Sequence, residues 1–500
     1  MVSIDLSTWG GLTLAILPEV VVSAAAMVLL VVAAFRHHGE ADQRLAGRGA
    51  IVGLLAGAVA LLFISLLGRP AGLATMVSVD PFRAMSSGVI LLGGVLTVLA
   101  SLGYVGRERI LAPEYYVLLL LATVGALFMC SSVDLIAIFL GLELMSVSVY
   151  ILAGIDRRSG FSAEAALKYF LIGAFASGFL LYGIALIYGA TGTTNLTLID
   201  FQVGSMGLQS NKLILAGLAL LLIGFGFKVA AVPFHMWAPD VYDGAPTPVT
   251  AFMAAAVKAA GFAALARVFA QGFGRHVELW QAGVWWLAAL TMLLGNLIAL
   301  TQTQLKRMLA YSSVAHAGYL LTAIASGTAL GGAALLFYIF AYTLMTVGAF
   351  AVLGALGRDG ERGVRIDDLA GLARRRPWVA AATTVFMLSL LGFPGTAGFI
   401  GKWYILAAVI QAHQGALAVL LVGASVLSAG YYLPVIMAMY MRPEQPGATD
   451  IGRLPGGTRW VVAVAATLLL LFGVWPNRVL DLARSGGQAT RPNASFTVSE

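Results

Sequence analysis

The stretch LLIGFGFKVAAVPFHMWAPDVYDGAPTPVTAFMAAAVKAAGF, from Leu221 to Phe262, decides the fold and the class of function. It places two lysines, Lys228 and Lys258, in otherwise apolar sequence on either side of a segment rich in proline, glycine and aspartate. A charged side chain near the centre of a bilayer costs about 2.5–3.5 kcal/mol on insertion scales, so an intramembrane lysine indicates function. Buried lysine can release its proton, whereas arginine stays charged. The stretch therefore predicts lysines that gain and lose protons inside a membrane.

The composition excludes a soluble globular protein. Of the 500 residues, 60% are hydrophobic and 11% are charged, whereas globular chains carry about 25% charged residues. The mean hydropathy of +0.91 agrees. The single cysteine, Cys130, can form no disulfide within the chain, and no cysteine and histidine cluster with the spacing of an iron–sulfur or zinc site is visible. The basic residues are scattered through short loops, which indicates membrane topology rather than a nucleic-acid partner.

Segments of about 20 apolar residues, the length that crosses a bilayer, occur fourteen times and predict an all-α polytopic membrane protein. The twelfth segment contains GFPGTAGFIG (Gly392–Gly401), which predicts two half-helices with a break between them. The seventh is followed closely by Pro233, where a similar break is expected. Such breaks are tolerated at membrane depth only where they are buried in protein or line a polar cavity. The predicted segments are 12–35, 50–68, 83–105, 114–131, 133–154, 163–190, 212–232, 248–270, 281–301, 308–327, 331–357, 377–411, 415–441 and 459–477.

The distribution of basic residues predicts the orientation. With both termini outside, most of the 30 lysines and arginines fall in cytoplasmic loops, as the positive-inside rule requires, and the number of spans is even. Residues 1–11 contain no basic residue, so the first apolar segment does not resemble a cleaved signal peptide.

Two short motifs raise the question of an internal repeat. GFGFK precedes Pro233 in the seventh segment, and GFPG precedes GFIGK in the twelfth. The offset of five helices is odd, so equivalent helices would cross the membrane in opposite directions, as in inverted repeats that build a midplane site from broken helices. An inverted repeat and a chance likeness are equally open on these matches.

Glu143 lies near the middle of the fifth segment, DLIAIFLGLELMSVSVYIL. The alternative to a functional carboxylate is one that is neutralised by a helix neighbour or that reaches an interface. No basic residue lies three or four positions away, and the apolar flanks are long. We therefore expect its counter-charge on another helix, with Lys228 as the natural candidate, so that the two groups titrate as a coupled pair.

Lys258, in MAAAVKAAGF, is surrounded by small residues that let helices approach closely or leave room for water. Its structural alternative is a cation that pairs with Asp240 or Asp243. Lys402, in GFIGKWYIL, follows the break in the twelfth segment and faces either a cavity or the membrane–water boundary beside Trp403.

His316, in LKRMLAYSSVAHAGYL, is intramembrane and titrates near neutral pH when unperturbed. Ser312, Ser313 and Tyr319 would support a hydrated polar path around it, while a histidine satisfied by hydrogen bonds is the equally open alternative. His235 follows the seventh segment and is a candidate for gating or capping.

Four other charged residues receive structural predictions. Asp134 is expected to cap the fifth segment, Arg267 to reach outward from the end of the eighth, and Lys306 and Arg307 to anchor the tenth on the cytoplasmic side. The residues then leave one set of protonatable groups within the bilayer, which predicts a proton path or a cation antiporter rather than a redox site: Glu143, Lys228, Lys258, His316 and Lys402.

At these residues the sequence resembles a known family. FKVAAVPFHMWAPDVYDGAPTPVTAFMAAAVKAAGF, LKRMLAYSSVAHAGYL and LGLELMSVSVYIL are similar to the proton-translocating antiporter-like membrane subunits of NADH:quinone oxidoreductase, complex I, which are shared with multisubunit Na+/H+ antiporters. The likeness spans roughly residues 80–440, and GFPGTAGFIGKWYIL is most similar to the N-type subunits. M-type subunits carry a glutamate at the position of Lys402, and L-type subunits add a long lateral helix.

The resemblance implies fourteen helices with two inverted five-helix repeats. The expected divisions are 1–112 for helices 1–3, 113–271 for the first repeat, 279–441 for the second and 442–500 for helix 14 and a tail. By position, Glu143 matches the family's helix-five glutamate, Lys228, Lys258 and Lys402 match its lysines in helices seven, eight and twelve, and His316 matches its polar axis.

The resemblance also implies partners. No cofactor is expected in this chain, and FMN, iron–sulfur clusters and quinone would be bound by other subunits of a complex in a bacterial inner membrane. The expected neighbours are membrane-arm subunits, including other antiporter-like ones, and the lipid bilayer. Two alternatives stay open, namely a subunit of a Na+/H+ antiporter and a structural subunit whose buried charges only pair.

Overall fold

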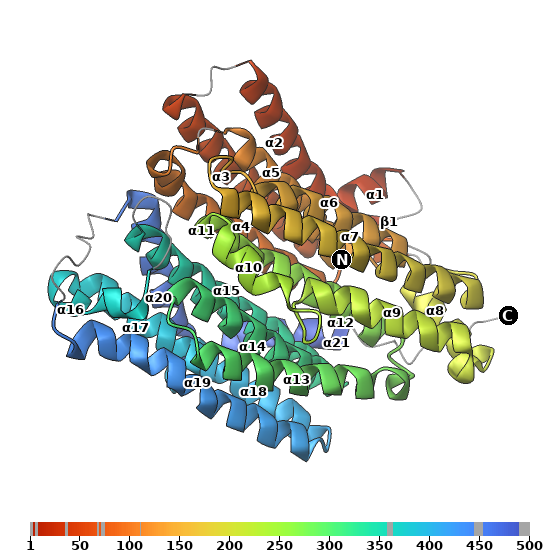
Figure 1. Ribbon diagram of the computed structural model, residues 1–500. Coiled ribbons are helices and arrows are strands. Elements are labelled where there is room, and N and C mark those ends of the chain that lie inside the picture. The colour runs from red at the N-terminus through yellow and green to blue at the C-terminus, as the bar shows by residue number, and fades with distance from the viewer. Residues whose placement is uncertain are drawn as a thin grey trace.

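The computed structural model describes residues 4–5, 9–35, 39–67, 70–71, 76–110, 112–357, 364–444 and 454–489, and within them it is almost entirely helical (Figure 1). The tail expected after helix 14 lies partly outside these residues. A two-residue parallel pair, β1 (Ile4–Asp5) with β2 (Pro70–Ala71), is the one sheet in the described residues. The helices before the middle of the chain are α1 (Trp9–Ala15), α2 (Leu17–Ala34), α3 (Glu40–Leu67), α4 (Pro81–Arg107), α5 (Glu114–Ser131), α6 (Leu135–Ala153), α7 (Gly160–Thr191), α8 (Leu196–Ser205), η1 (Leu208–Ser210), α9 (Lys212–Lys228), α10 (Trp237–Gly244), α11 (Thr247–Phe252), the π-helical η2 (Met253–Val257) and α12 (Lys258–Gly272).

The later helices complete fourteen spans. Twelve helices in the described part of the chain are long and apolar enough to cross a membrane. Two further spans are broken, one between α9 and α10 and one between α17 and α18, as the sequence predicts. The all-α polytopic fold is thereby confirmed. The later helices are η3 (Val277–Leu279), α13 (Gln281–Leu300), α14 (Leu305–Ala325), α15 (Ala329–Leu356), η4 (Ile366–Leu369), α16 (Leu372–Arg375), α17 (Pro377–Leu391), α18 (Ala397–Gln411), α19 (Gly415–Met441), α20 (Gly456–Val474) and α21 (Asn477–Ala489).

Both breaks have local causes. Helix α17 ends where Gly392 and Gly395 adopt a φ of 87°, a left-handed conformation that favours glycine. Gly392 also leaves room for Lys402, because a Cβ there would lie 2.9 Å from the lysine Cδ. Helix α9 ends at Lys228, where the Ala231 amide donates to the Gly226 carbonyl at 2.8 Å and Pro233 follows.

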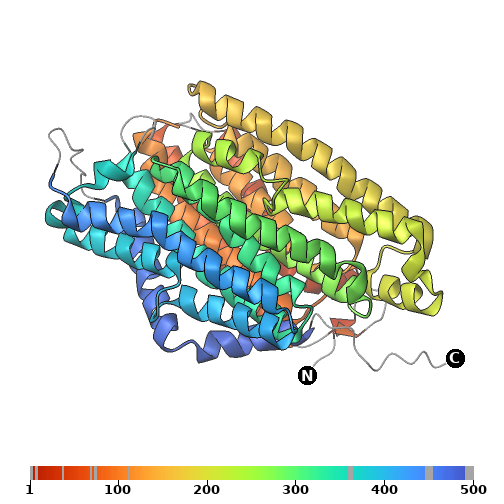
Figure 2. The same cartoon turned by 60° about the horizontal axis from the view of Figure 1, so that its bottom comes forward.

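The long helices run roughly parallel, with α2–α7 on one side, α13–α19 on the other and α9–α12 between them (Figure 1). Figure 2 shows the same arrangement with α7 at one edge and the C-terminal helices at the opposite one. The apolar windows of the continuous helix α11–α12 and of α14 and α15 are 100%, 94% and 94% buried, against 33% for α7. The helices that carry Lys258 and His316 are therefore the centre of the protein, and α7 is a surface helix.

One pattern of backbone hydrogen bonds occurs twice. In each case two hydrogen bonds join the start of one helix to the chain that follows the next helix. In each bond a backbone amide donates to a backbone carbonyl, once in each direction. Each member of the second set lies the same number of positions after its counterpart in the first. The pattern favours an internal repeat, while the domain boundaries given above stay a prediction. The bonds are Leu135 N to Thr194 O and Leu196 N to Val133 O, then Leu305 N to Val364 O and Ile366 N to Thr303 O, at 2.9, 2.9, 2.9 and 3.1 Å.

Arg267 does not reach outward, and that prediction is wrong. Its guanidinium is fully buried and grips the Asp80 carboxylate with two hydrogen bonds, Nη1 to Oδ2 at 2.8 Å and Nη2 to Oδ1 at 3.1 Å. Asp80 caps α4 and joins it to α12. A second buried pair, Arg83 with Glu19 at 2.8 Å, joins α4 to α2. A buried guanidinium with no partner would cost far more free energy than one that reaches the membrane interface. Both arginines are buried because each binds a carboxylate.

Helix α21 was not anticipated from the sequence. It buries Leu480 and Ala483 and packs along α15 and α4. Its polar and small residues keep it below the hydropathy of a membrane span, but Leu480, Ala483 and Gly487 lie on one face, and this amphipathic pattern was an available signal.

Candidate functional site

Lys228 is the last residue of α9, at the break in the seventh span. Its side chain is 3% exposed, and its Nζ donates a hydrogen bond to Ser146 Oγ on α6 at 2.8 Å. The Nζ also lies 5.9 Å from the centre of the Tyr169 ring. The Lys228 ammonium is therefore held inside the protein, at the break of the span, by a hydroxyl and beside an aromatic ring.

Glu143 does not form the expected ion pair with Lys228. Among the described residues no Lys228–Glu143 contact within 4 Å occurs, and Glu143 is half-buried and accepts a short hydrogen bond from Ser177 on α7. Ser146, which binds Lys228, lies three positions after Glu143 and so on a neighbouring part of the same helix. The carboxylate is thus placed one helical turn from the group that holds the lysine.

Lys258 is the first residue of α12, directly after the π-helical turn. Its Nζ donates to the carbonyl and the hydroxyl of Ser313 on α14, at 2.6 and 2.5 Å. The Tyr342 hydroxyl on α15 donates to the same Ser313 Oγ at 2.8 Å. The structural alternative of a pair with Asp240 or Asp243 is wrong, because those carboxylates bind other cations.

Those cations lie on a separate surface. Asp240 binds Lys168 at 2.8 Å and Arg307 at 3.3 Å, and Asp243 binds Arg307 at 3.8 Å. Lys306 is buried and donates to the Ala245 carbonyl at 2.8 Å. The predicted anchors thus bind the α10 segment.

His316 is fully buried between two tyrosines. Its Nδ1 lies 2.8 Å from the Tyr338 hydroxyl on α15, and its Nε2 lies 3.0 Å from the Tyr432 hydroxyl on α19. The Tyr432 hydroxyl also makes a short hydrogen bond with Ser312. Because a neutral imidazole has one donor and one acceptor nitrogen, it can pass a proton between two hydroxyls. The sequence left two alternatives open for His316, a histidine satisfied by hydrogen bonds and a member of a polar path. The structure agrees with both, because its two hydrogen bonds are made to hydroxyls of the path.

Lys402 faces the interior of the protein, whereas its neighbour Trp403 faces outward. The Lys402 side chain is 7% exposed, while Trp403 is 57% exposed. Its Nζ donates to the carbonyls of Leu390 and Leu391, at 3.1 and 2.9 Å, at the C-terminus of α17. The Nζ lies 4.5 Å from the centre of the Tyr319 ring. Like Lys228, Lys402 is held at the break of a span.

The sequence reasoning missed several hydroxyl and amide groups of this site. Tyr338 and Tyr342 lie at an i, i+4 spacing on a buried helix, which places both on one face and was an available signal. Asn296 of α13 donates to the Tyr319 hydroxyl at 3.2 Å and accepts from Tyr431 at 2.8 Å. Nothing local in the sequence marks Ser146, Asn296 or Tyr432, because their role depends on helix rotation. We call the whole set the polar axis: Lys228, Ser146, Lys258, Ser313, Tyr342, Ser312, Tyr432, His316, Tyr338, Tyr319 and Lys402.

The hydrogen-bonded groups of the polar axis pack side by side across both halves of the protein. Gly261, three residues after Lys258, packs against the Lys228 stem, since a Cβ there would lie 3.5 Å from the Lys228 Cγ. On the other side, the rings of His316 and Tyr319 lie 5.3 Å apart. Within the described residues, no group of three histidine, cysteine or carboxylate side chains that could hold a metal occurs. His235, between α9 and α10, is not part of this set. The arrangement can therefore exchange protons among lysines, hydroxyls and an imidazole.

Comparison with known proteins gives consistent relatives. The family model described as NADH:quinone oxidoreductase/Mrp antiporter, TM matches residues 132–428. NADH-quinone oxidoreductase subunit N of Gemmatimonas aurantiaca is 46% identical and covers 98% of this chain and 96% of its own length. Subunit N of Trichlorobacter lovleyi is also 46% identical, over 94% of this chain and 96% of its own.

Solved structures are similar along almost the whole chain. A chain of respiratory complex I from Thermus thermophilus with bound aureothin is 38% identical, with a TM-score of 0.80, over 93% of this chain and 99% of that one. A chain of the Mrp complex from Dietzia sp. DQ12-45-1b has a TM-score of 0.83 over 97% of this chain and 98% of that one, at 24% identity, which is a likeness of fold.

Proposed function

The chain belongs to the family of antiporter-like membrane subunits of NADH:quinone oxidoreductase, and from this premise we propose that it moves protons along the polar axis while quinone is reduced in other subunits. It is a component of that enzyme complex. Subunit N relatives match nearly its full length at 46% identity, whereas the Mrp chain is 24% identical, so the oxidoreductase is favoured over a Na+/H+ antiporter.

The observation that carries this proposal is the pair of hydrogen-bonded groups on adjacent residues of α14. Ser313 joins Lys258 to Tyr342, and Ser312 binds the Tyr432 hydroxyl, which also binds His316. All of these side chains are buried, and all except Tyr432 of α19 lie on the most enclosed helices of the protein. Polar groups buried inside a membrane cost free energy, and they mark functional sites for that reason. Their number here supports a proton path rather than a structural set of charges.

In the proposed path the lysines store protons and the hydroxyls and imidazole pass them on. A proton that leaves the Lys258 ammonium produces a neutral amine, and the same amine accepts the next proton. His316 receives a proton at one ring nitrogen and releases another from the opposite nitrogen, so its net charge is restored. Lys228 and Lys402 exchange protons at the two broken spans, where a lysine can be held in either form.

Glu143 is proposed to act on Lys228 through space. It lies one turn from Ser146 on α6 and is half-buried at the surface of the protein. A negative charge at this position favours a protonated Lys228, and a change in that charge shifts the balance. Glu143 is therefore a positioning residue that a neighbouring subunit can reach.

We propose partners on the same basis. Complex I assembles from several membrane-arm subunits, including other antiporter-like ones, and the exposed apolar face of α7 offers a surface for a neighbour or lipid. FMN, iron–sulfur clusters and quinone are assigned to partner subunits, which accords with a single cysteine in this chain. The exposed α7 side chains include Phe161, Leu167, Phe170, Phe175, Phe179 and Tyr182.

The proposed location is a bacterial inner membrane with both termini on the outer side. The bias of the 30 basic residues toward one set of loops supports this orientation. The cytoplasmic side would then hold Arg307 with Asp240, and Arg442 with Asp367.

Replacing Tyr432 by phenylalanine tests the hydrogen-bonded path. Tyr432→Phe keeps the ring and removes the hydroxyl that joins Ser312 to His316. Loss of one such bond is worth about 1 kcal/mol, so NADH-driven proton pumping by the complex in vesicles should fall about fivefold.

The matched control lies on the same helix. Tyr440→Phe removes a hydroxyl from an exposed part of α19, away from the polar axis, and pumping should stay at the wild-type rate. Equal rates in both variants, with equal assembly, would contradict the proposed path.

A further inference from the structure

A cavity of about 480 Å³ lies where α3 and α20 begin and α4 ends. Among the described residues that line it there is no member of the polar axis. Gly457 lets α20 begin directly against α4, because a Cβ there would collide with the Leu99 carbonyl. At Gly106 and Gly456, by contrast, a Cβ would meet nothing within 4 Å. The backbone of both helices therefore borders open space in this cavity.

Four charged side chains line the cavity, and their charges do not balance. Glu40 binds Arg44 at 3.1 Å, and Arg107 Nε binds Glu108 at 2.8 Å. Arg48 is exposed and has no hydrogen-bond or ion-pair partner in the part of the chain that the structure describes. The described residues thus present one unbalanced positive charge, which favours a ligand with one negative charge.

Gln43 of α3 leaves a buried acceptor at the cavity. Its side chain is 5% exposed, and its Nε2 donates to the Ala112 carbonyl at 3.2 Å. That bond fixes the orientation of the amide, and Gln43 Oε1 is buried without a donor among the described residues. Because a buried acceptor without a donor costs free energy, a ligand that carries a hydroxyl would be stabilised here.

The first turn of α20 supplies hydrogen-bond donors. Its N-cap is Pro455, and no side chain caps the turn. The turn borders the cavity through Gly456 and Gly457, and the first amides of a helix have no acceptor within that helix. Such amides, at the positive end of the helix dipole, bind phosphate and other anions. An anion therefore fits between this turn and Arg48.

An exposed apolar stripe on α3 continues from Arg48 along one face of the helix. From Arg48 to Leu66 it is about 27 Å long, close to the hydrocarbon thickness of about 30 Å. Trp460 of α20 is 67% exposed and lies one turn after Gly456, and exposed tryptophan is typical of the membrane–water interface. The cavity thus lies at the level of lipid headgroups and the stripe at the level of acyl chains. The members of the stripe are 51–74% exposed and follow at steps of three and four residues: Val52, Leu55, Val59, Leu62 and Leu66.

We propose that this cavity binds the headgroup of an anionic phospholipid of the phosphatidylglycerol type, which carries one phosphodiester charge and free hydroxyls. The phosphate accepts hydrogen bonds from Arg48 and from the first amides of α20, and a headgroup hydroxyl donates to Gln43 Oε1. The acyl chains follow the stripe on α3. Zwitterionic headgroups fit less well, because they bring a second positive charge beside Arg48. Basic pockets between membrane helices bind anionic headgroups in this way.

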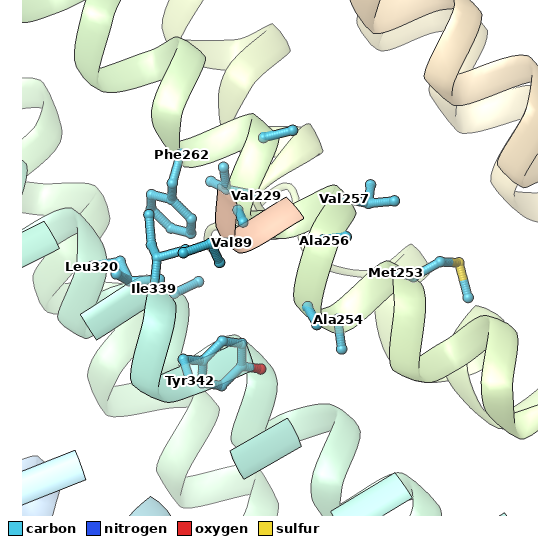
Figure 3. Packing of buried hydrophobic residues seen from close by; sticks show 14 of the residues in the cluster. Val89, Val229, Met253, Ala254, Ala256, Val257, Phe262, Leu320, Ile339 and Tyr342 are labelled. Carbon is cyan, nitrogen blue, oxygen red and sulfur yellow. The ribbon is translucent and has the colours of Figure 1, made fainter. Parts of the chain in front are cut away.

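Helix α4 connects this cavity to the centre of the protein. Its last turn borders the cavity, and farther back a Cβ at Gly93 would lie 3.3 Å from the Ala256 Cβ. Figure 3 shows Val89 of α4 in the buried cluster that also contains Ala256 and Phe262. Because α4 packs against both α3 and α20, a lipid bound where the three meet stabilises their packing. The inference does not depend on the proton path.

Photocrosslinking of lipid to the intact complex tests the site. The complex is reconstituted in phosphatidylcholine vesicles that contain a small share of phosphatidylglycerol with a diazirine in one acyl chain, and adducts are mapped by mass spectrometry. Adducts on residues 52–59 of α3 should form severalfold more often with this probe than with the matching phosphatidylcholine probe.

Two variants should each lower the phosphatidylglycerol adducts severalfold. Arg48→Gln removes the unbalanced charge at an exposed position, and Gly106→Leu fills the cavity without changing an arginine. The matched control is Arg157→Gln, which removes another exposed arginine from outside the cavity and should leave the adducts at the wild-type level.

Three results would overturn the proposal. Equal labelling by both probes, or unchanged labelling in both cavity variants, would mean that the cavity only borders bulk lipid. Competition by soluble glycerol 1-phosphate, which should have no effect, would show that the site takes a soluble phosphate ester instead of a lipid. Protection of residues 52–59 from every lipid probe would show that a partner subunit covers this face.

Discussion

Lys228→Ala is expected to lower NADH-driven proton pumping about a hundredfold, the lower end of what a positioned proton-transfer group contributes. NADH oxidation by an artificial acceptor, which reports assembly and the redox subunits, should persist. The reason is that Lys228 is 3% exposed, and its Nζ is bound by Ser146 and lies beside the Tyr169 ring. Alanine removes the one ammonium at the break of the seventh span and leaves Ser146 without a proton donor on α9.

Two further variants separate transfer from charge. Lys228→Arg keeps a cation that cannot release its proton under these conditions, so pumping should remain as low as in the alanine variant. Lys212→Ala removes a lysine from the exposed start of the same helix and should have no effect. If Lys228→Arg pumps at the wild-type rate, the site needs only a charge, and the structural reading of the buried lysines is the better one.

Arg267→Ala is expected to destabilise the subunit by about 3–5 kcal/mol, the cost of leaving one member of a buried ion pair alone. Arg267 is fully buried and is bound to Asp80, which is 16% exposed. Burial opposes the charged carboxylate, but Arg267, the Ser78 hydroxyl and the Arg83 amide together hold the pKa of Asp80 below its ordinary value. Without the guanidinium, burial favours the protonated form. The loss of stability in Arg267→Ala should therefore be smaller at acid than at neutral pH. It can be measured as the drop in unfolding temperature of the solubilised complex.

A double variant provides the control for this ion pair. Asp80→Asn with Arg267→Met replaces both charges by neutral groups of similar size, and asparagine can still cap α4. Because no lone charge remains, most of the lost stability should return. A double variant as unstable as Arg267→Ala would show that the arginine contributes by packing against Phe82, whose ring centre lies 4.8 Å away, rather than by charge.

The spans and their breaks could be predicted because they depend on composition and on the backbone. The length of an apolar segment indicates a helix that crosses a bilayer. Pro233, Gly392 and Gly395 indicate where such a helix is broken. Helix α10 was missed for the complementary reason. Its proline and two aspartates are typical of a loop, yet Trp237 is held by a hydrogen bond to the Phe227 carbonyl at 3.0 Å.

The site could be predicted in its charged members and not in its connections. An isolated lysine or histidine in an apolar segment is conspicuous, and Lys228, Lys258, His316 and Lys402 are all buried as expected. Which atom each one binds depends on how the helices are rotated about their axes, and no local pattern fixes that rotation. The predicted Glu143–Lys228 pair makes no direct contact, since α6 offers Ser146 to the lysine instead.

The π-helical turn at Met253–Val257 has a consequence for mutational scans of this subunit. A π-helical turn holds one residue more than an α-helical turn. Deletion of one residue from it should therefore be absorbed by a return to α-helical geometry, and Lys258, Phe262 and Ala266 should keep the face that meets α14 and α15. Deletion of one residue from an α-helical part of the same helix has no such reserve and would rotate everything after it by about 100°. The alanine-rich run is thus the one place in this helix where the loss of a residue should leave the direction of the Lys258 side chain unchanged.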